Sequence, residues 1–178
     1  MNGDVLIRPA GDRDWDAIAD MEAAAYGELG LSEGREALRS RAEVSPETCF
    51  VLEADGRAVG YLLALPYPAG RYPDLRQSET TAFVSRNLHL HDLVVAPPFR
   101  GGGMARRLLE HVAGTARTHG YEQLSLVAVG DSEGFWSSCG FTAHPRPVTA
   151  GGYGSTAVYM SAPVPVHGPR PSPPHESS

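Results

Sequence analysis

Apolar residues recur along this chain with two spacings, one typical of strands and one typical of helices. Alternating or continuous apolar runs predict strands at 5–8, 48–54, 57–65, 122–129 and 153–160, a strand that ends at Val95, and another that begins at Gly140. Stripes with helical spacing predict helices at 15–26, 32–43, from Met104 to the residue before Gly120, and 131–138. The resulting order β-α-α-β-β-β-α-β-α-β-β predicts a mixed α/β fold.

Turn and capping residues mark the ends of several elements. Asp55-Gly56, between two apolar runs, predicts a tight hairpin. Asp12 or Asp14 is expected to cap the first helix and Ser32 the second, because their side-chain oxygens can accept a bond from a free amide of the first turn. Strand, helix and strand from 87 to 129 are expected to form a right-handed parallel unit.

The segment from His89 to Ala105 joins a strand to a helix through a glycine-rich loop. Pro97-Pro98 ends the strand, because proline has no ladder donor and fixes φ. The three glycines at 101–103 let the backbone approach a ligand closely. The free amides at the start of a helix form an anion site, most often for phosphate.

Known kinds of glycine loop differ in the residues that accompany the glycines. A Walker-type loop requires Gly-Lys-Ser/Thr and is excluded, because the chain contains no lysine. A dinucleotide-binding loop requires a third glycine, where Arg106 stands, and an acid at the end of the next strand, whereas Glu122 stands at its beginning. Arg100, Gly103 and Ala105 instead satisfy Arg/Gln-x-x-Gly-x-Gly/Ala. A glycine-rich turn without a ligand is the remaining alternative, and the agreement of strand, loop and helix disfavours it.

Composition and charge exclude several classes of protein. With a net charge of −6 and no basic run, nucleic-acid binding is not expected. Cys49 and Cys139 have no metal-ligand spacing and indicate two buried thiols in a reducing compartment. The N-terminus lacks a signal-peptide pattern and no apolar run is long enough to span a membrane, so a cytoplasmic protein that does not bind membranes is expected. No pattern indicates the oligomeric state, which leaves a homodimer open.

Two stretches lack any hydrophobic periodicity. The segment from Pro66 to Arg86 is long for a loop in a compact domain and is expected to cover a substrate, with a plain surface excursion as the alternative. From Pro163 onward, frequent prolines predict a disordered tail. We therefore expect one domain at 1–162 and a proline-rich tail at 163–178.

Three motifs together resemble the GCN5-related N-acetyltransferase (GNAT) superfamily, over almost all of residues 4–160. The motifs are Val5-Leu-Ile-Arg-Pro-Ala, similar to the first strand of the family; Arg100-Gly-Gly-Gly-Met-Ala, similar to its acetyl-CoA pyrophosphate loop; and Phe135-Trp-Ser-Ser-Cys-Gly-Phe, similar to its aromatic-x-x-x-Gly-Phe segment. The resemblance implies a splayed sheet of six to seven strands flanked by helices, with acetyl-CoA between the strand that ends at Val95 and the strand at 122–129.

The resemblance also implies which residues hold acetyl-CoA. The backbone of Leu93, Val94 and Val95 would pair with the pantetheine arm. The asparagine that the family places near the start of the last helix has no counterpart, and Ser132 is the expected replacement. The pyrophosphate would lie on the amides of Arg100, Gly101, Gly102, Gly103, Met104 and Ala105.

His89 and His91 are the expected catalytic residues. Two residues apart on a strand, both imidazoles point to one face. An imidazole, with an unperturbed pKa of about 6.5, is well matched to taking a proton from an ammonium near neutral pH. The run His89-Leu-His91-Asp-Leu-Val-Val also resembles the arylalkylamine N-acetyltransferases, whose paired histidines stand at these two places.

Two other interpretations of the histidines remain open. Both could be hydrogen-bonded wall residues, or both could bind a metal, but no third ligand stands at a useful spacing and no metal is expected. Asp92 is expected to face the opposite side of the strand as a structural acceptor.

Trp136 departs from the resemblance. It stands where the family often places a tyrosine that protonates the leaving thiolate, and an indole N–H donates a hydrogen bond without giving up its proton. Either the thiolate leaves unassisted or another hydroxyl, such as that of Tyr153, replaces the tyrosine.

The sequence-based hypothesis is an N-acetyltransferase in which the primary amine of a small molecule attacks acetyl-CoA directly, with His89 and His91 as the general-base pair. One rival is a non-catalytic acyl-CoA-binding module, which Trp136 keeps open. The other is an acyltransferase of the same fold that uses a different acyl donor, such as a carrier-bound acyl group. The sequence does not identify the acceptor amine.

Replacing both histidines tests the general-base hypothesis. His89→Ala combined with His91→Ala is expected to lower kcat/KM by about 10²–10⁴, because the ammonium of the acceptor would lose its proton acceptor. Release of CoA thiol with a panel of amines measures this effect. A full rate retained across the pH range would contradict the role.

Overall fold

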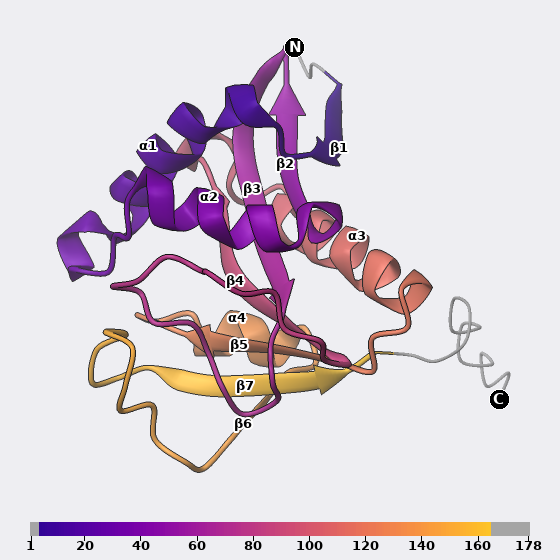
Figure 1. The fold of residues 1–178 in the computed structure, drawn as a ribbon. Helices are drawn as coiled ribbons and strands as arrows, with labels where there is room; N and C mark the ends of the chain where they lie inside the picture. Colours follow the sequence, from indigo (N-terminus) through magenta and orange to yellow (C-terminus); the bar gives the residue numbers. More distant parts are fainter. Residues whose placement is uncertain (1–3, 165–178) are drawn as a thin grey trace, which may run out of the picture.

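The computed structural model describes residues 4–164 and contains a seven-stranded mixed sheet in the order β1-β2-β3-β4-β5-β7-β6 (Figure 1). The predicted sheet of six to seven strands flanked by helices is confirmed. The strands are β1 (Val5–Pro9), β2 (Cys49–Ala54), β3 (Arg57–Pro66), β4 (Asn87–Val95), β5 (Gln123–Ala128), β6 (Thr142–Ala143) and β7 (Val158–Pro163). The helices are α1 (Trp15–Tyr26), α2 (Arg35–Val44), α3 (Met104–Thr118) and α4 (Glu133–Ser138), with short 3-10 turns η1 (Asp12–Asp14), η2 (Gly27–Leu29), η3 (Pro46–Thr48) and η4 (Pro97–Phe99).

Helices cover both faces of the sheet, and each face has its own apolar core (Figure 1). α1 and α2 pack on one face through Trp15, Ile18 and Leu38, which cluster with Tyr61 and Leu63 of β3. α3 packs on the other face, where its apolar stripe is buried together with Leu62, Leu88 and Leu126. Each amphipathic helix therefore buries its apolar stripe against one face of the sheet.

The central strand β4 has a different partner on each edge. It pairs antiparallel with β3 from Leu88 to Val95. It pairs parallel with β5 only from Asn87 to His89, opposite Gln123 to Ser125. The predicted parallel pairing of the two strands is confirmed, but it ends after three residue pairs and leaves the rest of this edge of β4 open.

The hairpin is confirmed, whereas both predicted helix caps are wrong. Asp55 and Gly56 adopt φ of 51° and 76°, as a tight two-residue turn requires. The Asp14 carboxylate accepts bonds from the Arg8 guanidinium and from the Gly11 amide, so it does not cap α1. The Ser32 hydroxyl donates to Glu22, and α2 begins only after Gly34. In both cases a charged side chain from elsewhere in the fold is the preferred partner.

The C-terminal strand lies later than its pattern predicts. Glycines with positive φ at 151, 152 and 154 break the extended conformation, so β7 begins at Val158 rather than at Tyr153. β7 includes Pro163, and the amide of the buried Val164 donates to the Glu122 carbonyl at 2.8 Å. The first residue of the expected tail therefore belongs to β7. The expected disordered tail from 165 onward lies outside the described residues.

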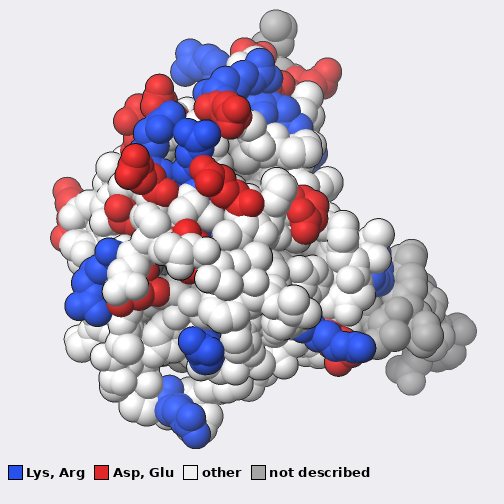
Figure 2. All heavy atoms as spheres, in the orientation of Figure 1, with Lys and Arg blue, Asp and Glu red and all other residues white. Residues whose placement is uncertain are grey.

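Charged side chains gather over α1 and α2, where arginines and acidic residues are interspersed, while the face around β6 and β7 carries few charges (Figure 2). Among residues 4–164, no helix is both long and apolar enough to cross a membrane.

Both cysteines are free, but only Cys49 is buried as expected and Cys139 is half-buried.

A buried arginine ties the irregular segment 67–86 to the helical layer. Arg41, on α2, has a side chain that is 1% exposed. Its guanidinium donates to Glu33 at 2.6 Å, to Glu79 at 2.7 Å and to the Asp74 carbonyl at 2.9 Å. One side chain thereby holds α2, the loop before it and the long segment together.

Removing this arginine is expected to destabilise the fold strongly. Arg41→Ala would leave two carboxylates buried without their partner, which costs about 3–5 kcal/mol in the free energy of unfolding. Arg39→Ala, on an exposed part of the same helix, removes an ion pair with Glu43 and is expected to cost about 0.5 kcal/mol or less. Urea unfolding of the two variants measures the difference, and equal losses would contradict the role of Arg41.

Candidate active site

A cavity of about 230 Å³ opens where β4 and β5 diverge. Leu90 and Leu93 form one wall, Leu126 and Val127 form the other, and the start of α3 and part of α4 close the space. Ligands of open α/β sheets bind outside the carboxyl ends of the strands, which is where this cavity lies. The end of the parallel pairing therefore creates the space for a ligand.

The loop before α3 has the geometry of an anion site. Gly101 and Gly103 adopt φ of 85° and 78°, values that favour glycine. The Arg107 amide donates to the Gly103 carbonyl, so the amides of the three residues before Arg107 have no helical acceptor. The loop offers these donors to an anion, and its fit to a pyrophosphate is good. Arg100 has a separate role, since its Nε donates to the Val95 carbonyl at 2.8 Å and joins the loop to β4.

The backbone groups of β4 alternate between its two edges. The Ala96 amide donates to the Val59 carbonyl, which fixes Val94 in a hydrogen-bonded pair with Tyr61. By the same alternation, Leu93 and Val95 direct their amides and carbonyls away from β3, toward the open edge. The geometry thus supports Leu93 and the Val95 amide, but not Val94, as partners for a pantetheine arm, since the Val95 carbonyl already accepts from Arg100.

A β-bulge in β4 changes which side chains face the cavity. Asp92 lies opposite Leu63 and Leu90 opposite Ala64, so His91 is an extra residue in the register. Because one residue is inserted, Asp92 lies on the same side of the sheet as the histidines, and its carboxylate accepts a bond from Tyr61 at 2.6 Å. The expectation that Asp92 faces the opposite side is therefore wrong.

His91 lies at the junction of the 230 Å³ cavity and a smaller one of about 40 Å³ that extends toward α1, and it contributes to the walls of both. Its side chain is 0% exposed, and its Nε2 lies 2.6 Å from the Glu33 carboxylate. Its Nδ1 is buried and has no hydrogen-bond partner among the described residues. An ionised carboxylate can only accept, so with Glu33 ionised Nε2 carries the proton and a neutral imidazole has its lone pair on Nδ1.

His89 lies in a different environment from His91, although the two rings are only 6.5 Å apart. Its Nδ1 lies 2.9 Å from the Ser125 hydroxyl, which accepts a bond from Asn87 and so can donate its own proton to the histidine. Burial, together with the nearby His91 and Arg41, lowers the pKa of His89 well below 6.5. His89 contributes to neither cavity that includes His91, so its geometry is that of a neutral wall residue.

Glu33 connects His91 to the buried Arg41. Burial raises the pKa of Glu33, but His91 and Arg41 outweigh that effect and the pKa is lowered overall. The ionised Glu33 carboxylate can thus accept from both neighbours at once. Glu33 therefore fixes the orientation of the imidazole and can stabilise an imidazolium.

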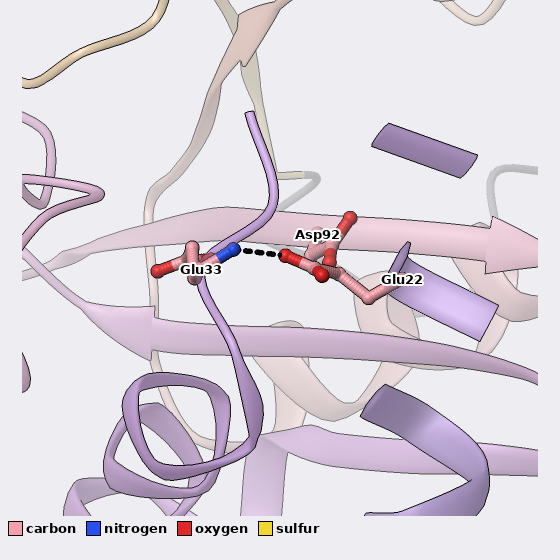
Figure 3. A group of neighbouring side chains, drawn as sticks. All are labelled: Glu22, Glu33 and Asp92. Carbon is pink, nitrogen blue, oxygen red and sulfur yellow. Dashed lines mark hydrogen bonds between the residues drawn. The ribbon is translucent and has the colours of Figure 1, made fainter. Parts of the chain in front are cut away.

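Three carboxylates meet beside His91. Glu22 comes from α1, Glu33 from the loop before α2 and Asp92 from β4, and each offers an oxygen within 4.8 Å of the others. Figure 3 shows the Glu33 amide bonded to the Glu22 carboxylate, at 2.6 Å. Sequence spacing indicated no third metal ligand near the histidines, whereas the fold assembles three oxygen ligands that could hold a cation.

Burial raises the pKa of Asp92 to about 7, against the lowering effects of His91 and the Tyr61 hydroxyl. A carboxyl with this pKa exchanges a proton near neutral pH. Asp92 is therefore a titrating member of the site.

The residues expected around the thiol lie in the larger cavity. Trp136 is 9% exposed and forms part of the wall, as does Ser132, whose hydroxyl donates to the Val129 carbonyl at 2.7 Å. The Tyr153 hydroxyl donates to the Pro73 carbonyl at 2.6 Å, and Tyr153 is not part of this wall. Tyr26, at the end of α1, contributes to both cavities.

Sequence reasoning did not find Glu22, Tyr26, Glu33 or Arg41. The only local signal is that Glu22 and Tyr26 are four residues apart on α1 and so share one helix face. Glu33 and Arg41 belong to a loop and a polar helix, and their role depends on contacts with segments far away in the sequence.

The titration of Asp92 should appear in protein stability. The folded-state pKa of about 7 exceeds the ordinary 3.8, so between these values the folded protein holds a proton that the unfolded chain has lost, and the contribution of Asp92 falls as pH rises. Asp92→Asn is expected to gain stability relative to wild type as pH rises from about 4 to about 7 and to keep that gain at higher pH, measured by urea unfolding. Asp20→Asn, on the exposed side of α1, is the control. A difference between Asp92→Asn and wild type that is independent of pH would contradict the buried titration.

Solved structures share this fold at low sequence identity. Ard1 from Thermoplasma volcanium superposes with a TM-score of 0.71 at 18% identity, over 90% of this chain and 97% of that one. The GphF GNAT-like decarboxylase in complex with isobutyryl-CoA gives 0.72 at 24% identity, over 90% of this chain and all of the other (100%). The N-acetylglutamate synthase from Neisseria gonorrhoeae, complexed with coenzyme A and N-acetyl-glutamate, gives 0.69 at 20% identity, over 92% of this chain and 36% of that one.

Sequence comparison identifies the family. No curated protein sequence matches the chain significantly. The acetyltransferase (GNAT) family model matches residues 15–141, which extend from the first helix to the aromatic-x-x-x-Gly-Phe segment. This match covers well over half of the chain and agrees with the fold. The chain therefore belongs to the acetyltransferase (GNAT) family.

Proposed function

We propose that this protein is an acetyl-CoA-dependent N-acetyltransferase that acetylates the primary amine of a small molecule by direct attack, with His91 as its general base. The observation that carries the proposal is the imidazole of His91, which is held by Glu33 at Nε2 and has a buried Nδ1 without a partner among the described residues, at the junction of two cavities. A positioned base with a free lone pair is what an acceptor ammonium requires.

The larger cavity suits the pantetheine of acetyl-CoA. Leu93 would offer its backbone groups and Val95 its amide along the open edge of β4, the amides from Gly101 to Arg106 would bind the pyrophosphate, and Ser132 would contact the arm from the start of α4. Bound in this way, acetyl-CoA supplies the acetyl thioester. The smaller cavity, on the other side of His91, would admit the acceptor amine.

The residues of this chain would then assist the proton transfers of the reaction. His91 Nδ1 removes a proton from the ammonium, and the Glu33 carboxylate stabilises the resulting imidazolium. Holding amine and thioester together contributes much of the remaining acceleration. The neutral amine would then attack the thioester carbonyl, the C–S bond would break, and the second proton lost by the nitrogen would end on the thiolate. The Trp136 indole can donate a hydrogen bond to that thiolate but not a proton.

This proposal assigns His89 a smaller role than the sequence-based hypothesis does. A neutral histidine bonded to Ser125 and removed from both cavities supports the wall behind His91. The likeness of the His-x-His strand to arylalkylamine N-acetyltransferases stays a hypothesis about the acceptor.

A second candidate function uses the same glycine loop and larger cavity with another acyl donor. The observation in its favour is the fold shared with the GphF GNAT-like decarboxylase, which was solved with isobutyryl-CoA. Product masses after incubation with acetyl-CoA, isobutyryl-CoA and a panel of amines would separate the two candidates, as would a complete absence of turnover for a module that only binds.

Single replacements test the assignment of the base. His91→Gln is expected to lower kcat/KM by about 10²–10⁴, whereas His89→Asn is expected to lower it less than about tenfold. Glu33→Gln should also lower kcat/KM, because His91 Nε2 loses the carboxylate that orients the imidazole. Release of CoA thiol measures all three variants. A larger loss in His89→Asn than in His91→Gln would overturn the assignment.

A further inference from the structure

The part of the small cavity next to His91 is formed by buried carboxylates. The three carboxylates are Glu22, which is 1% exposed, Asp92, which is 8% exposed, and Glu33, whose side chain is 3% exposed. They contribute to the same cavity as His91, whose buried Nδ1 has no partner among the described residues. An acceptor amine that enters this cavity would therefore share it with these acids.

Positive charge at this place is scarce. Arg41 is the arginine bonded to Glu33, and it is shared with Glu79. Within residues 4–164, Glu22 accepts bonds only from neutral donors, the Ser32 hydroxyl and the Glu33 amide, and Asp92 accepts from the Tyr61 hydroxyl. Among the described residues, Arg41 is thus the one arginine bonded to this acidic group, in which Asp92 is only partly ionised near pH 7. Apart from His91, the other residues that line the cavity are uncharged: Tyr26, Leu31, Leu75, Val127, Val129 and Tyr153.

Such a cavity favours a cation and repels an anion. Like charges brought together at a desolvated site cost several kcal/mol, and a site built in this way selects by rejection as well as by attraction. A carboxylate attached to the carbon next to the acceptor nitrogen would lie within a few bonds of that nitrogen, and so within the reach of Glu22 and Asp92.

We infer, building on the proposed function, that the acceptor is a cationic amine without a carboxylate beside its amino group, and that Glu22 and Asp92 exclude free amino acids. The fold itself does not impose this exclusion. The N-acetylglutamate synthase that shares it was solved with N-acetyl-glutamate, a molecule that carries two carboxylates.

Three matched probes isolate the effect of charge in the wild-type protein. Phenethylamine, phenylalaninamide and phenylalanine share one side chain, and the amide has nearly the same shape as the carboxylate without its charge. With acetyl-CoA, kcat/KM for phenylalaninamide is expected to exceed that for phenylalanine by about 100-fold or more. Isopentylamine, leucinamide and leucine repeat the comparison with an aliphatic side chain. Amide and carboxylate values within about threefold of each other, in both series, would overturn the inference.

A matched pair of variants tests whether the buried acid is responsible. Glu22→Gln is expected to reduce the preference for amide over carboxylate by about tenfold, because one buried negative charge is removed. Glu28→Gln, on the exposed turn that follows α1, is expected to leave the preference unchanged. An equal change in both variants would assign the preference to long-range charge and overturn the role of Glu22. The wild-type comparison stands if Glu22→Gln fails to fold.

Two further measurements test whether the exclusion of amino acids has another origin. One tests for a bound metal ion, and the other applies if catalysis is not observed. Repeating the assay in EDTA tests for a metal ion among the three carboxylates, and a preference that disappears in EDTA would overturn the inference. If no probe is acetylated, the proposed function fails, and calorimetric titration without acetyl-CoA then decides the inference by itself. Binding of phenethylamine but not of phenylalanine would uphold the exclusion, and equal binding would reject it.

Discussion

The early end of pairing between β4 and β5 is the constraint on which the site depends. A sheet interior normally satisfies every backbone amide and carbonyl, and unpaired groups there are costly. Here three residue pairs join the parallel strands, after which Leu93 and Val95 face an open edge. The divergence leaves an extended backbone ready to pair with a ligand, directly in front of the amides at the start of α3.

The β-bulge at His91 is the second structural feature that determines the geometry of the site. By inserting one residue into β4, it turns His91 and Asp92 toward the helical layer formed by α1 and α2. That layer supplies Glu22, Glu33 and, one contact further away, Arg41. A strand without a bulge would alternate strictly and would direct Asp92 to the other face. The bulge therefore decides how many ionisable groups meet at the base.

Buried charged groups fix the geometry of this site, and their desolvation costs free energy of folding. Arg41 satisfies Glu33 and Glu79 and fixes the segment 67–86, while Glu22 and Asp92 have only neutral donors among the described residues. A buried network of this kind contributes to specificity more reliably than to stability, because desolvation offsets much of its attraction. Burial raises the pKa of Asp92 to about 7, whereas Glu22, which accepts only from neutral donors among the described residues, makes the cavity receptive to a cation.

The sequence by itself determined the elements whose signals are local. Periodic apolar residues located the helices and the inner strands, Asp55-Gly56 located the hairpin, and the glycine loop before Met104 indicated a candidate anion site. It also placed both histidines on β4, close together. Only the tertiary structure decided which histidine faces a cavity, because the bulge and the hydrogen bond from Ser125 involve neighbouring strands. The acids and Arg41 were equally out of reach, since their significance lies in contacts between residues up to 58 positions apart and no local pattern encodes such contacts.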